Sequence, residues 1–538
     1  MPGAAGAKEP SGRPAGVAFA VALLALLSMA SISRWPLVEE GLWRDEAITA
    51  FIAQSPSLEV FLHRNRISDY NPPLLCALVA SWGRVFGFEE RSLKVLALLF
   101  GLAAIVAVAL LARKLAGNLA GFAAAFYAAN NGLLIDHSGD LRPYSLSVSL
   151  AVIALAIVID LRRSENDPKF RRRALALGLC LTLLVYTHIA GVLAAMIIGV
   201  FGVAMWATGR NRRAGRALTV AAAGAGVAFL PWLPIAWEQS RQGIPWELSS
   251  TLGARLYFIV TRREDLLPVG GLLGVAGFAA LGLALSHMWD RARERARALS
   301  VEAAPVFASA ILVPLLFALY SSGRRYLAIP SALAAVLVGC LIGLSWEHAR
   351  KKEVLVRFVT LAAIGAVFLG TFVARIPTYR ALDASEGISK SGIRDFCRSG
   401  PPPNLVLIAP DYLGPTVRYY CGPRITLRGF VEWSDPALFD SRRYAVLWRD
   451  PGVVARTVNQ LHQAVGSSPD ASFVLLSDAS DRRPPLFYGR RVEQLRAALE
   501  ARYTASNATT YRGRIESVQQ AVFSRRESSE SAALGSER

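Results

Sequence analysis

Two adjacent carboxylates, Asp45 and Glu46, lie in the stretch GLWRDEAITA at residues 41–50, just after the first long apolar run of the chain. A carboxylate at a membrane surface can accept the proton of an attacking hydroxyl and so act as a general base. The same two acids can instead cap a helix over AITAFIA, because acids are favoured at a helix N-terminus. The residues alone leave both interpretations open.

Charged and aromatic residues that suit an anionic ligand recur in polar segments between the apolar runs. They are Arg64, Arg66, Asp69 and Asn71 in residues 34–91, His137, Asp140, Arg142 and Tyr144 in HSGDLRPY (137–144), His188 in YTHIAG (186–191), and Arg324, Arg325 and Tyr326 in SSGRRYLAIP (321–330). Acids and cations that converge at one membrane face suggest a site that binds an anionic lipid and moves a proton. Alternatively, the arginines anchor lipid headgroups and the histidines are hydrogen-bonded interfacial residues.

Apolar runs of about 20 residues recur over the first 375 positions and are long enough to cross a bilayer core of roughly 30 Å. Of the 538 residues, 53% are hydrophobic and only 18% are charged. The first run, residues 16–32, is interpreted as a retained helix and not as a signal peptide. No A-x-A-like cleavage site follows it, and many further runs do. The composition therefore predicts a polytopic membrane protein.

The net charge of +19 is concentrated in clusters between the apolar runs. These clusters are Arg113-Lys114, RRSENDPKFRRR (162–173), GRNRRAGR (209–216), RARERARA (from residue 291) and ARKKEVLVR (349–357). Lys and Arg in short loops mark the cytoplasmic side of a membrane protein. This pattern accounts for the charge without nucleic acid, and it places the N-terminus in the cytoplasm.

We predict eleven spans and an outer loop, residues 34–91, that holds the paired acids. The spans are 15–33, 92–112, 117–135, 143–161, 174–187, 189–208, 216–237, 267–287, 303–320, 326–346 and 354–374. The apolar segment 72–88 begins with Pro-Pro and carries Arg84, and a full crossing there would move the cluster 162–173 to the outer side. We therefore expect residues 72–88 to form an interfacial helix on the outer leaflet.

From Ile376 the chain becomes polar, and short β-like runs alternate with helical patterns. The expected strands are 404–409, 424–427, 444–448 and 472–477, and the expected helices are 453–465 and 490–503. This alternation predicts a small α/β domain. Residues 1–375 would thus form the transmembrane domain and residues 376–525 an α/β domain on the outer side, while the tail 526–538 is predicted to be disordered.

The five cysteines fall into two groups. Three of them, Cys76, Cys180 and Cys340, lie in apolar segments and are expected to pack as small hydrophobic residues. Cys397 and Cys421 lie in the domain assigned to the oxidising outer side, where a disulfide can persist. A helix–strand–helix path between them can bring two helix ends to one side of a sheet. We therefore predict a disulfide, with two unrelated buried thiols as the alternative.

Six motifs occur in a fixed order along residues 1–350. They are WRDEA, DYNPPLL, FGFEERSL, RPY, YTH and RRYLAIP. Together with the predicted topology, they resemble the polyprenyl-phosphate-sugar glycosyltransferases of the GT-C superfamily. The resemblance is to bacterial, glycosyltransferase family 39-like relatives of dolichyl-phosphate-mannose–protein mannosyltransferases and to the lipid A aminoarabinose transferase. The expected fold is therefore mainly α, a polytopic membrane GT-C fold with a small C-terminal α/β periplasmic domain.

The resemblance implies that Asp45 deprotonates an acceptor hydroxyl, and we place Glu46 beside it with a larger part in holding the acceptor or loop. The hydroxyl would attack the anomeric carbon with inversion, for which a single general base suffices. Cations must then stabilise the leaving phosphate, and Arg142, Arg324 and Arg325 are available.

One departure from the family pattern concerns a metal. The aminoarabinose branch has an acid and a Lys just before the Pro-Pro, whereas this chain has Tyr70 and Asn71. We therefore assign no metal ligand, and a divalent cation as cofactor stays open. Arg64 or Arg66 could replace the missing lysine as a phosphate cation.

These inferences predict a multi-pass glycosyltransferase of the bacterial inner membrane that is mannosyltransferase-like and moves a hexose or pentose. Its partners would be a polyprenyl-phosphate-linked sugar and an acceptor in the cell envelope, which could be a glycan, a lipid or a protein. The alternative is a non-enzymatic lipid or solute transporter. Transporters usually have internal repeats and broken helices at the midplane, whereas the ionisable residues here cluster at one face.

Overall fold

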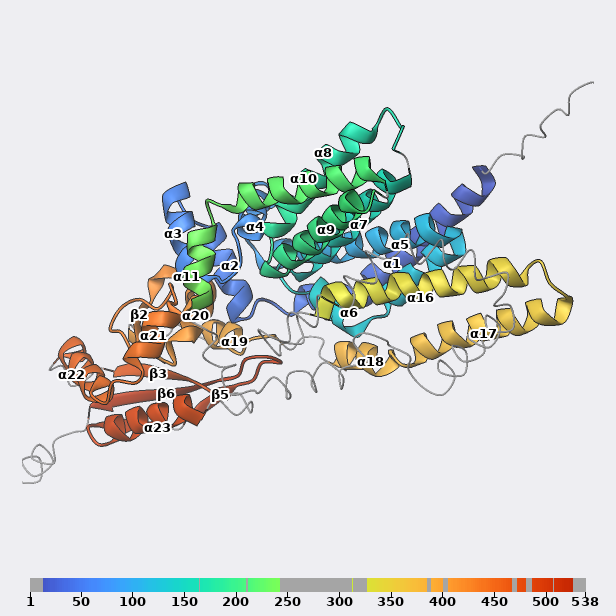
Figure 1. Cartoon of the computed structure of the whole chain (residues 1–538). Helices are drawn as coiled ribbons and strands as arrows, with labels where there is room; N and C mark the ends of the chain where they lie inside the picture. Colours follow the sequence, from blue (N-terminus) through green and yellow to red (C-terminus); the bar gives the residue numbers. More distant parts are fainter. Residues whose placement is uncertain are drawn as a thin grey trace, which may run out of the picture.

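The computed structural model describes residues 13–163, 165–209, 211–241, 312, 327–384, 389–399, 405–466, 472–479, 486–506 and 508–525. Figure 1 shows a helical part followed by a smaller domain that contains a sheet. The helices of the first part are α1 (Arg13–Glu39), α2 (Arg44–Ala53), α3 (Leu58–Ser68), α4 (Leu74–Phe86), α5 (Glu90–Ala129), α6 (Gly132–Ser138), α7 (Tyr144–Arg163), α8 (Phe170–Val185), α9 (Ile189–Ala207), α10 (Arg212–Phe229), α11 (Leu233–Arg241), α16 (Ala328–Ala349), α17 (Val354–Val373) and α18 (Ile376–Ala384).

Several of these helices can cross a membrane. Within the described residues, five are long and apolar enough, or six if α10 and α11, which meet at a bend of 75°, form one broken span. The chain is thus a multi-pass membrane protein. The number of eleven spans stays a prediction. The helices at the predicted spans 174–187 and 189–208 are not among those counted here, and the predicted spans 267–287 and 303–320 lie outside the described residues.

Helix α5 folds back on itself, so its 40 residues do not form one straight rod. Gly117 has a φ of 86°, in the left-handed region that favours glycine. Beyond this turn, a Cβ on Gly121 would lie 2.8 Å from the carbonyl oxygen of Ala109. The two halves are therefore antiparallel, as predicted for spans 92–112 and 117–135. The second half ends at Ala129, earlier than predicted, and α6 begins three residues later.

Close approach of backbones holds α16 against α5. Gly339 and Gly343 lie one turn apart on α16, in a G-x-x-x-G arrangement. A Cβ on Gly339 would lie 2.4 Å from the carbonyl oxygen of Ala120, and one on Gly343 would lie 2.6 Å from the Ala120 side chain. Only glycine fits at these two positions. Such contact is a main source of helix association where lipid surrounds the bundle and the hydrophobic effect is weak.

Helix α4 covers the segment predicted to lie flat on the membrane. It has 13 residues, which at 1.5 Å per residue span about 20 Å, too short for a bilayer core of roughly 30 Å. Its buried side includes Leu75, Cys76 and Val79. The helix is thus no independent span, and its orientation relative to the membrane stays a prediction.

The C-terminal part contains a six-stranded mixed sheet with the strand order β2-β1-β3-β6-β4 and β5 also paired to β6. Its strands are β1 (Leu405–Ala409), β2 (Thr426–Gly429), β3 (Ser472–Asp478), β4 (Tyr503–Ala505), β5 (Thr509–Tyr511) and β6 (Val518–Arg525). Its helices are α19 (Ile393–Arg398), α20 (Gly414–Cys421), α21 (Ser441–Leu447), α22 (Val453–Val465) and α23 (Leu486–Glu500), with short 3-10 turns η2 (Asp411–Leu413) and η3 (Gly422–Arg424). Strand β1 pairs in parallel with β2 and β3, and β6 is antiparallel to β3.

Alternating side chains divide the core of this domain into two layers. Leu407, Phe473 and Leu475 pack against α21, α22 and α23 on one face of the sheet. Val406, Ile408 and Val474 pack against α19 and α20 on the other face. The predicted small α/β domain is therefore present, with helices on both faces of the sheet.

One predicted strand is wrong. Residues 444–448 lie in and just after helix α21, not in a strand. The Tyr444 amide donates to the carbonyl oxygen of Asp440, and Tyr444 and Trp448 then meet one turn apart with ring centroids 5.2 Å apart. Both rings are buried, so the apolar residues of this run are spaced as on one face of a helix. Strands β4, β5 and β6 were not predicted.

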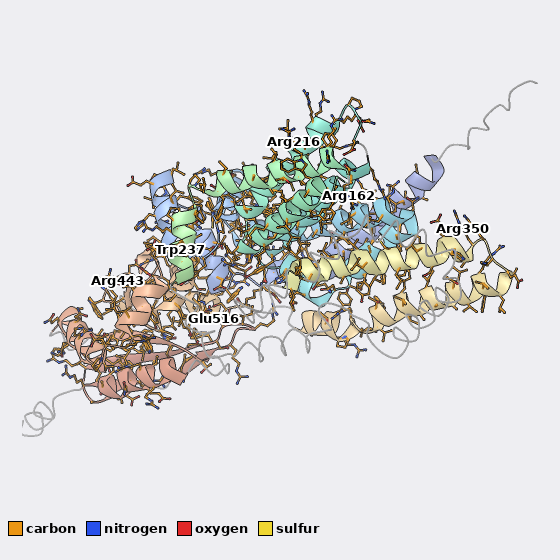
Figure 2. All side chains as sticks on the ribbon, viewed as in Figure 1. Arg162, Arg216, Trp237, Arg350, Arg443 and Glu516 are labelled. Carbon is orange, nitrogen blue, oxygen red and sulfur yellow. A yellow bond between two sulfur atoms is a disulfide. The ribbon has the colours of Figure 1, made fainter. Side chains whose placement is uncertain are left out.

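The labelled arginines of the helical part lie away from the C-terminal domain. Arg162, Arg216 and Arg350 lie toward the end remote from that domain, whereas Trp237 lies near it (Figure 2). The arginines belong to three of the basic clusters that the sequence assigns to the cytoplasm. The bundle thus places these clusters together, opposite the C-terminal domain.

Candidate active site

The first turn of α2 positions the paired acids. Trp43 precedes the helix, and its amide donates to Glu46 Oε2 at 3.3 Å, so Glu46 supplies the side-chain half of a capping box. Asp45 points elsewhere: a fifth of its side chain is exposed, and one oxygen lies 3.3 Å from Arg44 Nε. Glu46 therefore caps the helix, and the carboxylate of Asp45 is partly accessible.

Glu46 is fully buried and holds together three parts of the chain. Its Oε1 atom accepts from Lys94 Nζ on α5 at 2.7 Å and from the Leu141 amide at 2.7 Å. Its Oε2 atom lies 3.3 Å from Lys390 Nζ of the C-terminal domain. A buried carboxylate with this many charged and backbone partners is fixed in place, which suits the holding role expected for Glu46.

A second acid, Asp140, shares the same cluster. Lys390 Nζ lies 2.8 Å from Asp140 Oδ1, and His137 Nδ1 lies 3.4 Å from Oδ2. Although burial alone would raise the pKa of Asp140, the Lys390 ammonium and His137 lower it well below its usual range. Burial alone would lower the pKa of Lys390, but Asp140, Glu46 and Glu40 raise it above its usual value. Asp140 and Lys390 are thus an ion pair.

Arg142 joins the loop before α7 to two other segments. Its Nη1 atom donates to the backbone oxygen of Asp45 at 3.1 Å and to Asp69 Oδ2 at 3.1 Å, while Nη2 donates to Asp69 Oδ1 at 3.3 Å. The amide nitrogens of Asn71, main chain and side chain, also donate to Asp69 Oδ1, at 3.0 and 2.8 Å. Asp45, Asp69, Asn71 and Arg142, all predicted site residues, are therefore gathered in one place.

Three rings lie next to this group. Tyr144 stacks on His137 with centroids 4.4 Å apart and meets His188 edge-on at 5.6 Å. All three side chains are buried. Tyr144 follows Arg142 by two residues, so the packing of these rings fixes the start of α7 next to Arg142.

The remaining predicted residues lie elsewhere. Arg64 donates to the carbonyl oxygen of Phe51 at 3.0 Å and lies over the Phe51 ring, which fastens α3 to α2. Arg66 forms an exposed ion pair with Glu238 at 2.9 Å. Gln239 on α11 donates to the backbone oxygens of both Arg66 and Asp69, so this end of α3 is tied to α11. Arg324, Arg325 and Tyr326 lie outside the described residues.

The C-terminal domain approaches the same turn of α2. Arg44 lies over the ring of Tyr412 at 4.5 Å, and the Tyr412 hydroxyl donates to Asp478. Asp478 ends β3, and Tyr412 follows β1, so both lie at the carboxyl ends of parallel strands, the usual ligand edge of such sheets. Burial raises the pKa of the nearby Glu516 to about 7, although Arg44 opposes the shift.

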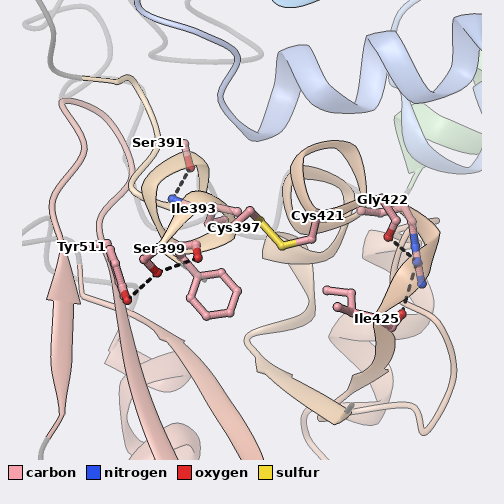
Figure 3. The surroundings of a disulfide bond; sticks show 10 residues. Ser391, Ile393, Cys397, Ser399, Cys421, Gly422, Ile425 and Tyr511 are labelled. Atoms are coloured by element: carbon pink, nitrogen blue, oxygen red, sulfur yellow. Dashed lines mark hydrogen bonds between the residues drawn. A yellow bond between two sulfur atoms is a disulfide. The ribbon is translucent and has the colours of Figure 1, made fainter. Parts of the chain in front are cut away.

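The disulfide predicted from the sequence is present. Cys397 at the end of α19 is bonded to Cys421 at the end of α20, with Cα atoms 5.1 Å apart (Figure 3). It joins the two helices on the face of the sheet that turns toward α2. From α20, the Tyr420 hydroxyl lies 2.7 Å from the Leu42 amide and 3.0 Å from its carbonyl oxygen. The bridge thus braces a docking surface of the C-terminal domain.

A cleft of about 880 Å³ lies between this surface and the outer loop. Its lining includes Phe51, Gln54, Phe88, Arg398 and Tyr419. At about 100° per residue, Phe51 and Gln54 are turned roughly 120° and 180° from Asp45 around α2. The cleft is therefore separate from the side of α2 that carries Asp45.

No metal centre is evident in the part of the chain that the structure describes, where no three His, Cys, Asp or Glu side chains are grouped to hold an ion. The acid nearest the Pro-Pro, Asp69, is already engaged by Arg142 and Asn71. The Asn71 amide thus orients Asp69.

Two buried lysines were missed from the sequence. Lys94 lies within an apolar run, and an ionisable residue there is by itself a signal of function. Lys390 has no comparable signal, because its neighbours are polar and its acidic partners lie 250 and 344 residues away. Its role is visible only from the contact between the two domains.

Comparisons with known proteins identify the fold. The sequence matches no protein-family model and no curated protein. The structure is similar to ArnT from Cupriavidus metallidurans in the apo state, over 94% of this chain and 98% of that one, with a TM-score of 0.57 and 13% identity. For ArnT bound to undecaprenyl phosphate the coverage is 95% and 98%, the TM-score 0.53 and the identity 14%.

A third similar structure is the archaeal oligosaccharyltransferase AglB from Archaeoglobus fulgidus, in complex with an inhibitory peptide and a dolichol-phosphate. It is similar over 90% of this chain and 73% of its own length, with a TM-score of 0.53 and 15% identity. These neighbours are GT-C superfamily polyprenyl-phosphate-sugar glycosyltransferases. This chain therefore has the GT-C fold, as its motifs predicted.

Proposed function

We propose that this chain is an integral membrane glycosyltransferase that moves a sugar from a polyprenyl-phosphate donor to a hydroxyl group of a cell-envelope acceptor. The observation that carries the proposal is the juxtaposition of a partly exposed carboxylate, Asp45, with a fixed guanidinium, Arg142, on a GT-C fold. A general base and an anion-binding group are the two functions that such a transfer needs.

In the proposed reaction Asp45 removes the proton of the acceptor hydroxyl as its oxygen attacks the anomeric carbon. The bond from that carbon to the phosphate oxygen breaks on the opposite face, and the polyprenyl phosphate leaves with the electron pair. The products are an inverted glycoside and the lipid phosphate. Because the attack is direct, one carboxylate suffices and no covalent intermediate forms.

Arg142 would stabilise the charge that develops on the phosphate. Its Nε atom is buried and has no hydrogen-bond partner among the described residues, so the guanidinium keeps one donor that the protein itself does not satisfy. Two carboxylates beside a binding site would repel a phosphate, and Arg142 neutralises Asp69 there. Arg324 and Arg325 stay candidates for further phosphate contacts.

The presence of undecaprenyl phosphate in one similar structure and of a dolichol-phosphate in another supports a lipid-linked donor. We place the transfer at the periplasmic face of a bacterial inner membrane, and the C-terminal domain on that side. The gathering of Arg162, Arg216 and Arg350 at the opposite end supports this orientation, because Lys and Arg are retained in the cytoplasm (Figure 2).

Glycan analysis of the cell envelope tests the proposal. A strain that lacks the chain should lack one sugar substituent, and the full-length protein should restore it, whereas Asp45→Asn at equal abundance should not. Comparing the anomeric configuration of donor and product then tests inversion. Unchanged envelope glycans in the deletion strain, with lipid or solute movement by the purified protein in vesicles, would favour the transporter alternative.

A further inference from the structure

Lys390 enters the buried cluster from outside the helical part. It lies in the segment 389–391, which is tied to the C-terminal sheet by a bridge between Ser391 and Glu516. The backbone oxygen of Lys390 accepts from the Ile515 and Glu516 amides at 2.9 Å each. This side chain therefore moves with the C-terminal domain.

The ammonium group of Lys390 lies where two segments of the helical part meet. Its Nζ atom is 3.3 Å from Glu46 on α2, and 2.8 Å from Asp140 and 3.1 Å from the carbonyl oxygen of Gly139 in the loop before α7. Asp45 directly precedes Glu46, and Arg142 follows Asp140 by two residues. One ammonium group thus joins the segment that carries the base to the segment that carries the arginine.

The charges of the cluster balance only when Lys390 is in place. Glu46 and Asp140 contribute two negative charges, and Lys94 and Lys390 contribute two positive ones. His137 faces Asp140, and the backbone oxygen of Glu40 accepts from the Lys390 amide at 2.7 Å. Without Lys390, one buried negative charge would be left next to a site that has to bind a phosphate.

We propose that Lys390 of the C-terminal domain is a positioning residue for the transfer, which it serves by holding Glu46 and Asp140 so that Asp45 and Arg142 keep their relative place. This inference rests on the proposed function. If the inference holds, the site is active only when the C-terminal domain is docked, because the helical part by itself lacks the Lys390 ammonium group.

Variants of the full-length protein at Lys390 test the proposal. Binding is measured in lipid nanodiscs with undecaprenyl phosphate as the probe. Transfer is measured by restoration of the envelope glycan in the deletion strain. Lys390→Met keeps most of the volume and removes the charge. We expect it to weaken binding of undecaprenyl phosphate at least tenfold and to lower transfer by about the same factor. Lys390→Met combined with Asp140→Asn restores neutrality, so binding of undecaprenyl phosphate should return to within about threefold of the unchanged protein. Transfer should stay low, because Glu46 and Asp140 are still not held together.

Arg398→Met is the matched control, because it removes an ion pair between the same two domains, with Glu90 at 3.7 Å, that does not touch the cluster. It should bind and transfer normally. Equal binding and transfer by Lys390→Met would overturn the proposal. So would normal transfer by the double variant, since the site would then keep its geometry without the contacts that Lys390 makes.

If Lys390→Met does not fold, the neutral double variant decides the question, since it should fold and bind but transfer poorly. Failure of the proposed function itself looks different. In that case the unchanged protein does not bind undecaprenyl phosphate, or Asp45→Asn restores the envelope glycan.

Discussion

The Nη1 atom of Arg142 lies 3.1 Å from the backbone oxygen of Asp45, so the side chain proposed to bind phosphate also fixes the turn that carries the proposed base. The same guanidinium is paired with Asp69 through both terminal nitrogens. A planar, forked group can make these contacts at once, whereas an ammonium group cannot.

Replacing Arg142 with lysine should therefore lower transfer by roughly 10²-fold, because the lost positioning contact and the lost phosphate donor together cost about 2.7 kcal/mol. The charge is kept, so a milder loss is expected if Arg142 acts only as a point charge. Arg456→Lys is the control, since Arg456 makes an exposed ion pair with Asp450 in the C-terminal domain, away from Asp45. Near-normal transfer by Arg142→Lys would argue against a bidentate role.

Asp45→Asn keeps the shape of the side chain but cannot accept a proton. Transfer should fall by roughly 10²–10⁴-fold while thermal unfolding is unchanged, because general-base catalysis contributes about that much. Asp167→Asn, which alters a carboxylate in the loop between α7 and α8, should have no effect on transfer. Substantial restoration of the envelope glycan by Asp45→Asn would remove Asp45 from the mechanism.

The convergence of Asp45, Asp69 and Arg142 could be predicted from the sequence because it follows from the number of membrane crossings between their segments. Polar segments that alternate with membrane spans are delivered to the same face, and helix ends at one face of a compact bundle must meet. The GT-C fold could be inferred in the same way, from motifs whose order matches the order of the spans.

Contacts between the two parts of the chain could not be predicted. Lys390 reaches Glu46 through the docking of a separately folded domain, and no periodicity in ISKSGIRDF indicates a buried charge. Residues 444–448 were assigned to a strand because Tyr, Val and Trp favour strands. A helix started by Asp440 places Tyr444 and Trp448 on one buried side instead, so tertiary packing overrode local preference.

Reporter fusions test the orientation of the membrane part. A reporter after Lys169, in the loop between α7 and α8, should indicate the cytoplasm, because that loop is rich in Arg and Lys. A reporter after Arg525, at the end of β6, should indicate the periplasm. If both report the same side, the number of crossings is wrong, and the predicted spans 267–287 and 303–320, which lie outside the described residues, are the first to reconsider.

The disulfide can be tested by counting reactive thiols. Among the five cysteines, Cys76, Cys180 and Cys340 are free and buried. Unfolding without a reductant should therefore expose three thiols to a labelling reagent, and unfolding with a reductant should expose five. Replacing Cys397 and Cys421 with serine should lower the free energy of unfolding by roughly 3 kcal/mol, since the bridge closes a loop with a separation of 24 residues. Five reactive thiols without reduction would contradict the bridge.

Glu516 should make stability depend on pH. Its carboxyl group is buried, accepts a hydrogen bond from Ser391 Oγ at 2.8 Å, and lies near Arg44 and Asp478. Burial raises its pKa from 4.5 to about 7. The folded chain therefore holds this proton more tightly than the unfolded chain, so the free energy of unfolding should fall as pH rises from about 4.5 to 7. The slope should reach roughly 1.4 kcal/mol per pH unit and level off above the folded pKa.

Glu516→Gln removes this titration and should be less sensitive to pH over the same range. Thermal unfolding of both proteins between pH 4.5 and 8 measures the difference. Asp411, whose pKa burial also raises to about 7, is present in both proteins and cancels in the comparison. Parallel unfolding curves for the two proteins across this range would mean that the folded chain does not hold the Glu516 proton more tightly than the unfolded chain does.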